Sequence, residues 1–307
     1  MIKWIVLAVF IACALYVHFR GKVRHKFLRQ LTDHSTFMAP LNVLMYAFSR
    51  VPTTPYLAPA DFPELETLRS NWQVIRDEAI ALAKASRIKA TNQFNDAGFH
   101  SFFRTGWKRF YLKWYDDAPH PSALKWCPRT VEILRRTPSI KAAAFTELPP
   151  GAQLGKHRDP FAGSLRYHLG LITPNDDRCL IRVDGHPYSW RDGEGVVFDE
   201  TYIHWVDNDT DQDRIILFAD LERPMKYRWA TWLNHAVART LLHAGSSPNE
   251  AGDRTGGVNK IFKYAYSLRR VGKAFKKRNR KLYYATKWSL FAVILVAIFA
   301  PWRWLLH

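Results

Sequence analysis

Cysteine is scarce in this chain of 307 residues. The three cysteines, Cys13, Cys127 and Cys179, are far apart and show neither the spacing of a zinc site nor a disulfide framework. This excludes a disulfide-stapled scaffold and fits a reducing compartment. The sequence also lacks internal repeats and low-complexity tracts. Its length therefore accommodates one large domain, or one domain with appended segments.

Acidic residues are absent from both ends of the chain. Six of the 45 Lys and Arg residues lie within residues 1–29 and twelve lie within residues 260–307, and neither range contains Asp or Glu. The remaining 27 basic residues equal the 27 acidic residues, so residues 30–259 have no net charge. The net charge of +18 therefore belongs to the ends. No nucleic-acid partner is expected, because such a partner requires a basic domain surface.

Two apolar runs adjoin these basic ends. Trp4–Phe19 and Trp288–Trp302 contain no Asp, Glu, Lys or Arg. Each run is shorter than the roughly 20 residues that cross a bilayer, but Lys3 and Arg303 can extend them by snorkelling. Both runs are interpreted as transmembrane helices, with buried helices of a soluble protein as the alternative. A signal peptide fits the first run poorly, because the positive residues follow it.

The basic clusters predict the topology. They follow the first apolar run and precede the second, so both lie on the side of the central region. The positive-inside rule then predicts a central domain in the cytoplasm, with short termini across the membrane. The predicted segments are a transmembrane helix (1–20), a basic juxtamembrane arm and connector (21–61), the central domain (62–225), a helix and linker (226–259), a basic juxtamembrane segment (260–287) and a second transmembrane helix (288–307).

The central region changes from helical to strand-like patterns. Apolar residues recur every three or four positions from Pro63 to Ser86, which predicts a helix, and two more helices are predicted at Pro128–Arg136 and Trp229–His243. A Gly- and Ser-rich linker is expected from Gly245 to Gly257. Short segments bounded by turn residues predict strands at Trp107–Trp114, Lys141–Glu147, Ser164–Thr173, Cys179–Val183, Gly195–Phe198 and Asp213–Leu221. The expected fold class is mainly β with flanking helices (α+β), as a sandwich or barrel.

The strand region contains a candidate metal site. His157, Asp159 and His204 follow the order His-x-Asp … His, and two imidazoles with one carboxylate can occupy one face of an octahedral Fe(II). In the predicted strand between them, Arg166 and His168 share one face because strand side chains alternate. Cations on a core-like strand require a buried acidic partner or ligand.

Arg214 presents a second cation to an apolar wall, in the last predicted strand. A guanidinium is suited to bidentate binding of a carboxylate. A structural pairing of Arg214 with Asp199 or Asp207 is the alternative. Likewise, His157 could belong to a surface turn and His204 could be an ordinary core histidine.

From about Phe62 to Pro224 the chain resembles the aspartyl/asparaginyl β-hydroxylase family of Fe(II)/2-oxoglutarate dioxygenases. The motifs that carry this resemblance are Glu147-Leu-Pro-Pro-Gly, His157-Arg-Asp-Pro, Arg166-Tyr-His-Leu-Gly-Leu, Trp190-x-x-Gly, Phe198-Asp-Glu-Thr-Tyr-Ile-His and Asp213-Arg. The resemblance implies a double-stranded β-helix (jelly-roll, cupin-like) core, an oxygenase domain at 62–225, and the use of Fe(II), 2-oxoglutarate and O2.

The resemblance also implies roles for individual residues. His157 and His204 would be iron ligands. Arg214, Arg166 and His168 would hold the carboxylate of 2-oxoglutarate, and Thr146 and Trp107 fall near further cosubstrate-contacting positions. The sequence departs from the family at Asp159, where the animal peptide hydroxylases have Gly. This chain therefore keeps a full His/Asp/His set.

With its two apolar runs, the whole chain resembles the bacterial lipid A 2-hydroxylases. That resemblance implies a membrane lipid substrate, lipid A, hydroxylated at C2 of a fatty acyl chain. Two alternatives stay open. The substrate could be Asp or Asn residues of a cytoplasmic protein, or the chain could be a non-catalytic membrane-anchored β-domain that binds a lipid or a partner.

Overall fold

The structure is a computed structural model that describes residues 2–91 and 95–299. The chain divides into two compact units, Met1–Asn259 and Lys260–His307. The first unit contains every described strand and both histidines of the candidate metal site.

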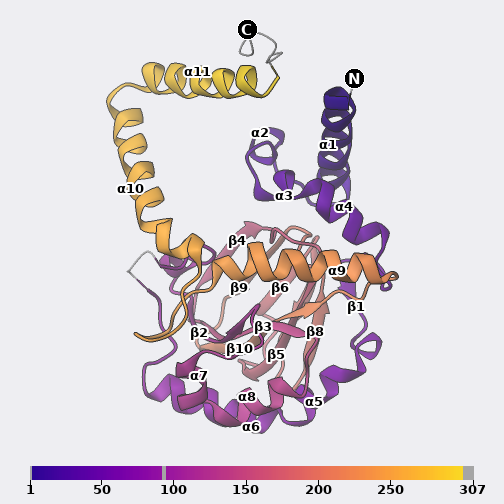
Figure 1. Cartoon of the computed structure of the whole chain (residues 1–307). Helices are drawn as coiled ribbons and strands as arrows, with labels where there is room; N and C mark the ends of the chain where they lie inside the picture. The colour runs from indigo at the N-terminus through magenta and orange to yellow at the C-terminus, as the bar shows by residue number, and fades with distance from the viewer. Residues whose placement is uncertain (1, 92–94, 300–307) are drawn as a thin grey trace. The chain divides into compact units, whose positions relative to one another are not determined.

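The described strands form two antiparallel sheets (Figure 1). The six-stranded sheet has the order β1-β8-β5-β10-β3-β2 and the four-stranded sheet has the order β4-β9-β6-β7. The strand bounds are β1 Tyr56–Leu57, β2 Lys108–Trp114, β3 Ile140–Leu148, β4 Gln153–His157, β5 Ser164–Ile172, β6 Cys179–Val183, β7 His186–Ser189, β8 Gly195–Phe198, β9 His204–Asn208 and β10 Arg214–Glu222. These antiparallel sheets confirm the predicted mainly β core.

The six predicted strands match β2, β3, β5, β6, β8 and β10 within about a residue at most ends. Three strands of the smaller sheet, β4, β7 and β9, were not predicted. They are short, and their polar residues and Gly155 interrupt the alternating pattern on which such a prediction depends. The missed strands matter, because β4 ends at His157 and β9 begins at His204.

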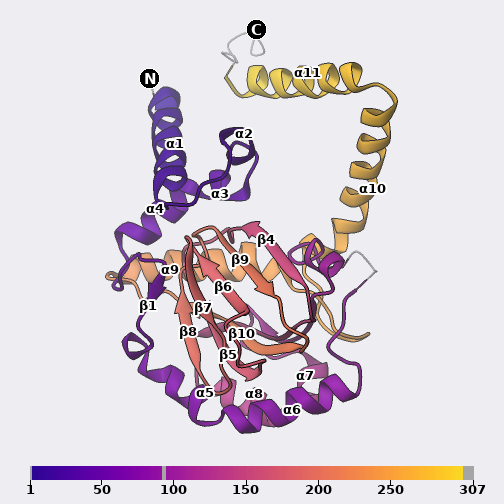
Figure 2. The ribbon, with the colours of Figure 1, turned by 180° about the vertical axis from the view of Figure 1, so that it is seen from behind.

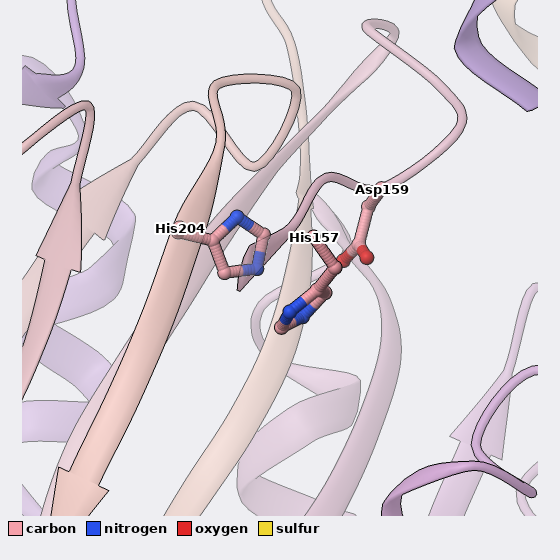
Figure 3. A group of neighbouring side chains, drawn as sticks. All are labelled: His157, Asp159 and His204. Carbon is pink, nitrogen blue, oxygen red and sulfur yellow. The ribbon is translucent and has the colours of Figure 1, made fainter. Parts of the chain in front are cut away.

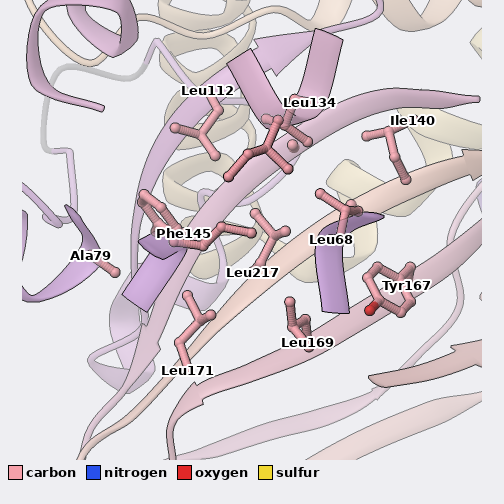
Figure 4. Packing of buried hydrophobic residues seen from close by; sticks show 14 of the residues in the cluster. Leu68, Ala79, Leu112, Leu134, Ile140, Phe145, Tyr167, Leu169, Leu171 and Leu217 are labelled. Carbon is pink, nitrogen blue, oxygen red and sulfur yellow. The ribbon is translucent and has the colours of Figure 1, made fainter. Parts of the chain in front are cut away.

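Two apolar cores lie on the two faces of the six-stranded sheet. One core lies between the sheets and includes Ile181, Val206 and Ile216. The other lies beneath a layer of helices and includes Phe145, Leu169 and Leu217 (Figure 4). The layer consists of α5 (Glu66–Ser70), α6 (Trp72–Lys84), α7 (Pro121–Trp126) and α8 (Pro128–Arg135) (Figure 1). A strand of this sheet is therefore buried on both faces.

The helix predicted over Pro63–Ser86 is interrupted. A 3₁₀ turn at Pro63–Leu65 leads into α5, and α6 starts only at Trp72. Between α5 and α6, the side chain of Asn71 donates a hydrogen bond to the carbonyl oxygen of Thr67 at 2.9 Å. Asn competes for helix backbone groups in this way, which the apolar periodicity does not reveal.

The segment after the first apolar run is folded onto the domain. Helix α1 (Ile2–Phe19) is followed by α2 (Phe27–Gln30), α3 (His34–Phe37) and α4 (Ala39–Ala47). The last turn of α1, α4 and helix α9 (Arg228–Val237) share a third apolar core, which includes Val17, Met45 and Val237. The predicted arm is thus a packed part of the first unit.

The region after β10 is also more ordered than the sequence suggested. Helix α9 continues through a π-helical turn, Ala238–Leu242, and a 3₁₀ turn, His243–Gly245, in agreement with the predicted helix. The expected linker packs against β2, because Ser247 and Asn249 are buried and bond to Arg109.

The second unit contains α10 (Gly257–Arg278) from Lys260 onward and α11 (Arg280–Phe299). Among the described residues, α1 alone is long and apolar enough to cross a membrane. The predicted second span, 288–307, extends beyond the described residues at position 299 and stays a prediction.

Candidate metal centre and cosubstrate pocket

The three predicted metal ligands come together at the end of two neighbouring strands. His157 and His204 face each other in the register of β4 and β9, and Asp159 follows two residues after His157. Their ligand atoms all lie within 4.8 Å of one another, and the two imidazole rings are 4.2 Å apart (Figure 3). This spacing allows all three side chains to bind one ion.

Backbone carbonyls orient both histidines. Nδ1 of His157 lies 2.7 Å from the carbonyl oxygen of Gly155, and Nδ1 of His204 lies 3.0 Å from that of Tyr202. A carbonyl only accepts, so Nδ1 carries the proton and Nε2 remains for a metal, as is usual for metal-bound histidine. Burial lowers the pKa of both imidazoles, that of His204 to about 3. Both are therefore neutral at physiological pH, the form that binds metal.

Asp159 is ionised and held in place by Arg166. Nη2 of Arg166 donates a hydrogen bond to Oδ2 of Asp159 at 2.6 Å. Burial alone would raise the pKa of Asp159, but Arg166 and the two imidazoles hold it well below its usual range. Asp159 is thus a negatively charged, pre-oriented carboxylate beside the two histidines.

Arg166 is surrounded by carboxylates. Besides Asp159, its guanidinium contacts Glu200 and lies 2.9 Å from Asp220. The expectation from resemblance was that Arg166 holds the cosubstrate carboxylate. With three carboxylates already around it, Arg166 is better placed to orient Asp159 than to bind a further anion.

Arg214 has the opposite environment. Its side chain begins β10, is 2 % exposed and lies 4.5 Å above the ring of Trp190. Its Nε and Nη2 atoms have no hydrogen-bond partner among the described residues. Burial lowers its pKa to about 10, so it remains a cation at neutral pH. Arg214 is therefore a buried positive charge that lacks a counter-ion within the described part of the chain.

The alternative pairing of Arg214 is wrong. Asp199 binds Arg20 at 2.5 Å and Arg223 at 2.8 Å, and Asp207 binds Arg182 at 2.6 Å.

More polar atoms without partners surround Arg214. Neither ring nitrogen of His168 has a hydrogen-bond partner in the described structure, and the same is true of Oγ1 of Thr146. Burial lowers the pKa of His168 well below its ordinary value, so its imidazole is neutral. Buried polar groups are rarely left without partners in proteins, so this cluster indicates a polar ligand.

One cavity joins the metal ligands to this cluster. All eight predicted site residues line it: Trp107, Thr146, His157, Asp159, Arg166, His168, Arg214 and His204. Arg214, Thr146 and His168 form its buried end, whereas His157 and Asp159 are half-buried and mark the end nearer the surface. Aromatic rings complete the wall, with Trp107 stacked on Phe99 at 4.9 Å.

The segments that carry the ligands are fixed by the arm, which sequence reasoning missed. Nη1 of Arg158, which stands between His157 and Asp159, donates to the carbonyl oxygen of Val17 in α1 at 3.1 Å. Asn42 of α4 bonds to Pro160 and Ala162, each at 2.9 Å. The segment with His157 and Asp159 therefore rests on α1 and α4.

The loop before His204 has its own support. Arg20 donates to Asp199 at 2.5 Å and to Thr201 at 2.8 Å, and its guanidinium lies 3.9 Å from the ring of Tyr202. Tyr46 donates to the hydroxyl oxygen of Thr201 at 2.8 Å. Arg20 stands immediately after the apolar run, where basic residues are expected for topology alone, so the sequence offers no sign of this role.

Glu200 was also missed as part of the site. It contacts Arg166 and accepts a hydrogen bond from Ser164 at 2.7 Å. Burial raises the pKa of Glu200 well above its ordinary value. Its place in the motif before His204 was the available signal.

These features describe a candidate metal site between two antiparallel sheets. Residues 69–224 match the model of the aspartyl/asparaginyl beta-hydroxylase family. The match covers half of the chain, so the chain belongs to this family.

Two relatives illustrate the range of the family. An ornithine lipid ester-linked acyl 2-hydroxylase of Rhizobium tropici is 30% identical over 204 residues, which cover 64% of this chain and 72% of that protein. The aspartyl/asparaginyl beta-hydroxylase of Homo sapiens is 27% identical over 191 residues, which cover 59% of this chain and 24% of that protein. The chain thus matches only about a quarter of the human enzyme.

Solved structures show weaker likeness. A Pseudomonas putida prolyl-4-hydroxylase is 16% identical, with a TM-score of 0.33, over 60% of this chain and 99% of that one.

Proposed function

We propose that this protein is a membrane-bound Fe(II)- and 2-oxoglutarate-dependent dioxygenase that hydroxylates C2 of a fatty acyl chain of lipid A. The observation that carries the proposal is the buried cation of Arg214, which shares one cavity with the His157/Asp159/His204 cluster. A metal site alone would not require a buried guanidinium without a counter-ion.

The residues present fit both groups. His157, Asp159 and His204 would hold Fe(II), because two neutral imidazoles and a carboxylate suit this ion. Arg214 would bind one carboxylate of 2-oxoglutarate through the nitrogen atoms that lack partners, and the hydroxyl of Thr146 lines the same buried end. Fe(II) held there would allow O2 to react with 2-oxoglutarate and the acyl chain, each of which supplies two electrons, so that one oxygen atom would become the new hydroxyl group and the other would enter succinate, with release of CO2.

The chain's own part in this reaction is to orient the reactants and exclude water. Arg214 fixes the depth of the cosubstrate, while Arg166 keeps Asp159 ionised and directed at the metal. The aromatic wall around Trp107 and Phe218 limits the access of water to the reacting atoms. The substrate would enter at the half-buried end, beside His157 and Asp159.

A lipid substrate is supported by two separate observations. Helix α1 is apolar and long enough to cross a membrane, and it is joined to the metal-ligand segments through Arg158. The relative from Rhizobium tropici carries the name of a lipid acyl 2-hydroxylase. The choice of lipid A among membrane lipids comes from the resemblance of the whole chain.

The proposed location is the bacterial inner membrane, with the catalytic domain in the cytoplasm. The basic residues that follow α1 support this orientation. A reporter fused to the C-terminus should behave as periplasmic if residues 288–307 form the second span. A cytoplasmic reporter signal would contradict the two-span topology.

Mass spectrometry of lipid A from cells with and without the gene tests the function. We expect one added oxygen atom on an acyl chain, lost in His157→Ala and Arg214→Ala and retained in the surface control Leu124→Ala. Unmodified lipid A despite normal expression would refute the proposal.

The name of the human relative favours a second candidate, hydroxylation of Asp or Asn residues of a cytoplasmic protein. Turnover of 2-oxoglutarate with peptides, but not with lipid, would support that candidate. Absence of turnover with both would support the non-catalytic lipid- or partner-binding domain.

A further inference from the structure

A short segment, residues 24–31, lies against the end of α1. The ring of Phe27 is 6.0 Å from that of His18, and the guanidinium of Arg24 is 5.1 Å from the ring of Phe19. In two opposite views α2 lies beside α1, on the side of α1 toward β4 (Figures 1 and 2). We call residues 24–31 the α2 segment.

The α2 segment exposes large apolar side chains. Phe27 is 56%, Leu28 79% and Leu31 51% exposed. Basic residues alternate with them, at Arg24, Lys26 and Arg29, and the segment has no acidic residue. Mixed aromatic, aliphatic and basic side chains are typical of segments that lie in the interface of a membrane with anionic lipids.

The same segment is bonded to the backbone beside the candidate metal site. Nη2 of Arg29 donates to the carbonyl oxygen of Lys156 at 2.9 Å, one residue before His157. Shortly after the segment, Nε2 of His34 lies 2.8 Å from the carbonyl oxygen of Arg158. The half-buried end of the cavity is formed by His157 and Asp159, so the α2 segment stands next to the strand that borders this end.

We propose that the α2 segment inserts into the surface of the bilayer and forms the lipid-facing side of the entrance to the metal cavity. Its partner is a membrane surface that contains anionic phospholipid. The proposal rests on the proposed function, a membrane lipid as substrate, and adds the route by which that substrate arrives. An acyl chain leaving the bilayer beside Leu28 would meet the entrance without crossing bulk water.

Spin-label accessibility in vesicles tests the insertion. The full chain with Cys13→Ala would carry a label at Leu28→Cys or Leu31→Cys, because Cys127 and Cys179 are buried. The matched control is Leu124→Cys on α7, a leucine that is also exposed (43%) and belongs to the helix layer on the other side of the six-stranded sheet.

In phosphatidylcholine vesicles with phosphatidylglycerol, labels at 28 and 31 should favour lipid-soluble O2 over a water-soluble nickel complex. The label at 124 should show the reverse. Labels at 28 and 31 that behave like the one at 124 would overturn the proposal. Equal insertion without phosphatidylglycerol would overturn the part assigned to Arg24, Lys26 and Arg29.

A kinetic measurement tests the role at the entrance. Leu28→Glu should raise the KM for lipid in vesicles by about tenfold, the loss expected for partial burial of one leucine. Its Fe(II) affinity should stay at the wild-type value, and Leu28→Met should behave as wild type. An unchanged KM in Leu28→Glu would contradict the proposal.

The accessibility of the spin labels in vesicles can be measured whether or not the protein catalyses hydroxylation. If the wild-type protein did not hydroxylate lipid, the proposed function would fail, while the accessibility data would still decide whether the α2 segment inserts.

Discussion

Replacing Arg214 should make the ligand-free protein more stable, although most buried substitutions destabilise. The guanidinium is charged in the unfolded chain, and burial lowers its pKa in the folded chain from its ordinary value to about 10. A cation with a lowered folded pKa destabilises the fold at every pH below that pKa. This difference corresponds to about 3 kcal/mol at neutral pH. Arg214→Met, which keeps an apolar side chain of similar length, should remove that cost.

The expected rise in melting temperature is roughly 5–10 °C, since about 1 kcal/mol shifts a domain of this size by 2–4 °C. The same variant should lose its response to cosubstrate. Two charge-assisted hydrogen bonds contribute at least about 3 kcal/mol, so the affinity for 2-oxoglutarate should fall by roughly 100-fold or more. Wild-type protein at 100 times its Kd for 2-oxoglutarate should gain about 2.7 kcal/mol of stability, and the variant should gain almost none.

Thermal unfolding in detergent, with and without 2-oxoglutarate, measures the first effect. Anaerobic titration of 2-oxoglutarate into metal-loaded protein measures the second. Arg214→Lys is the matched control, because it keeps the charge and loses the bidentate geometry. Arg214→Lys should bind 2-oxoglutarate weakly, and it should be no more stable than the ligand-free wild type. Our reasoning would be refuted if Arg214→Met were less stable than the ligand-free wild type, or bound 2-oxoglutarate with wild-type affinity.

Three further predictions concern the ligand segments and the fold. Asp159→Ala should lower metal affinity at least 100-fold in a titration, whereas near-normal turnover would indicate a centre with two histidines only. Arg158→Ala should weaken metal binding by roughly 10–100-fold through loss of its support on α1, while Arg182→Ala, which breaks a surface pair, should not. Burial lowers the pKa of His120 to about 4, so below about pH 6.5 the unfolded chain binds a proton that the folded chain does not. Denaturant unfolding should therefore show that about 2 kcal/mol of stability is lost between pH 7 and pH 5. In His120→Gln the free energy of unfolding should depend less on pH. An equal loss of stability in this variant would contradict the role given to His120.

Local patterns in the sequence were sufficient to predict many of the residues that line the cavity. In β5, Arg166 and His168 alternate with Leu165 and Leu169, and this alternation places both polar residues on the cavity side. Such patterns do not predict the order in which the strands pair. The register that brings His157 opposite His204 joins residues far apart in the chain, in two strands too short to be recognised.

Long-range pairing of charges was also beyond the sequence. Asp199 is one of the two candidate partners of Arg214, yet it binds Arg20, from 179 residues away, and Arg223. No local sequence pattern distinguishes a carboxylate that pairs with a residue of the arm from one that pairs with a residue of the cavity. Only the three-dimensional structure shows that Arg214 has no counter-ion among the described residues.

The double burial of β5 has a consequence for folding fidelity. Leu165, Tyr167 and Leu169 lie in the core beneath the helices, and Arg166 and His168 point to the opposite face. A slip of one residue would exchange these two sets. The guanidinium of Arg166 would then lie in the apolar core beneath the helices, away from Asp159, Glu200 and Asp220, at a cost of several kcal/mol. The polar residues that face the cavity thus also favour the correct register of β5, because a shifted pairing of β5 with its neighbours would be much less stable.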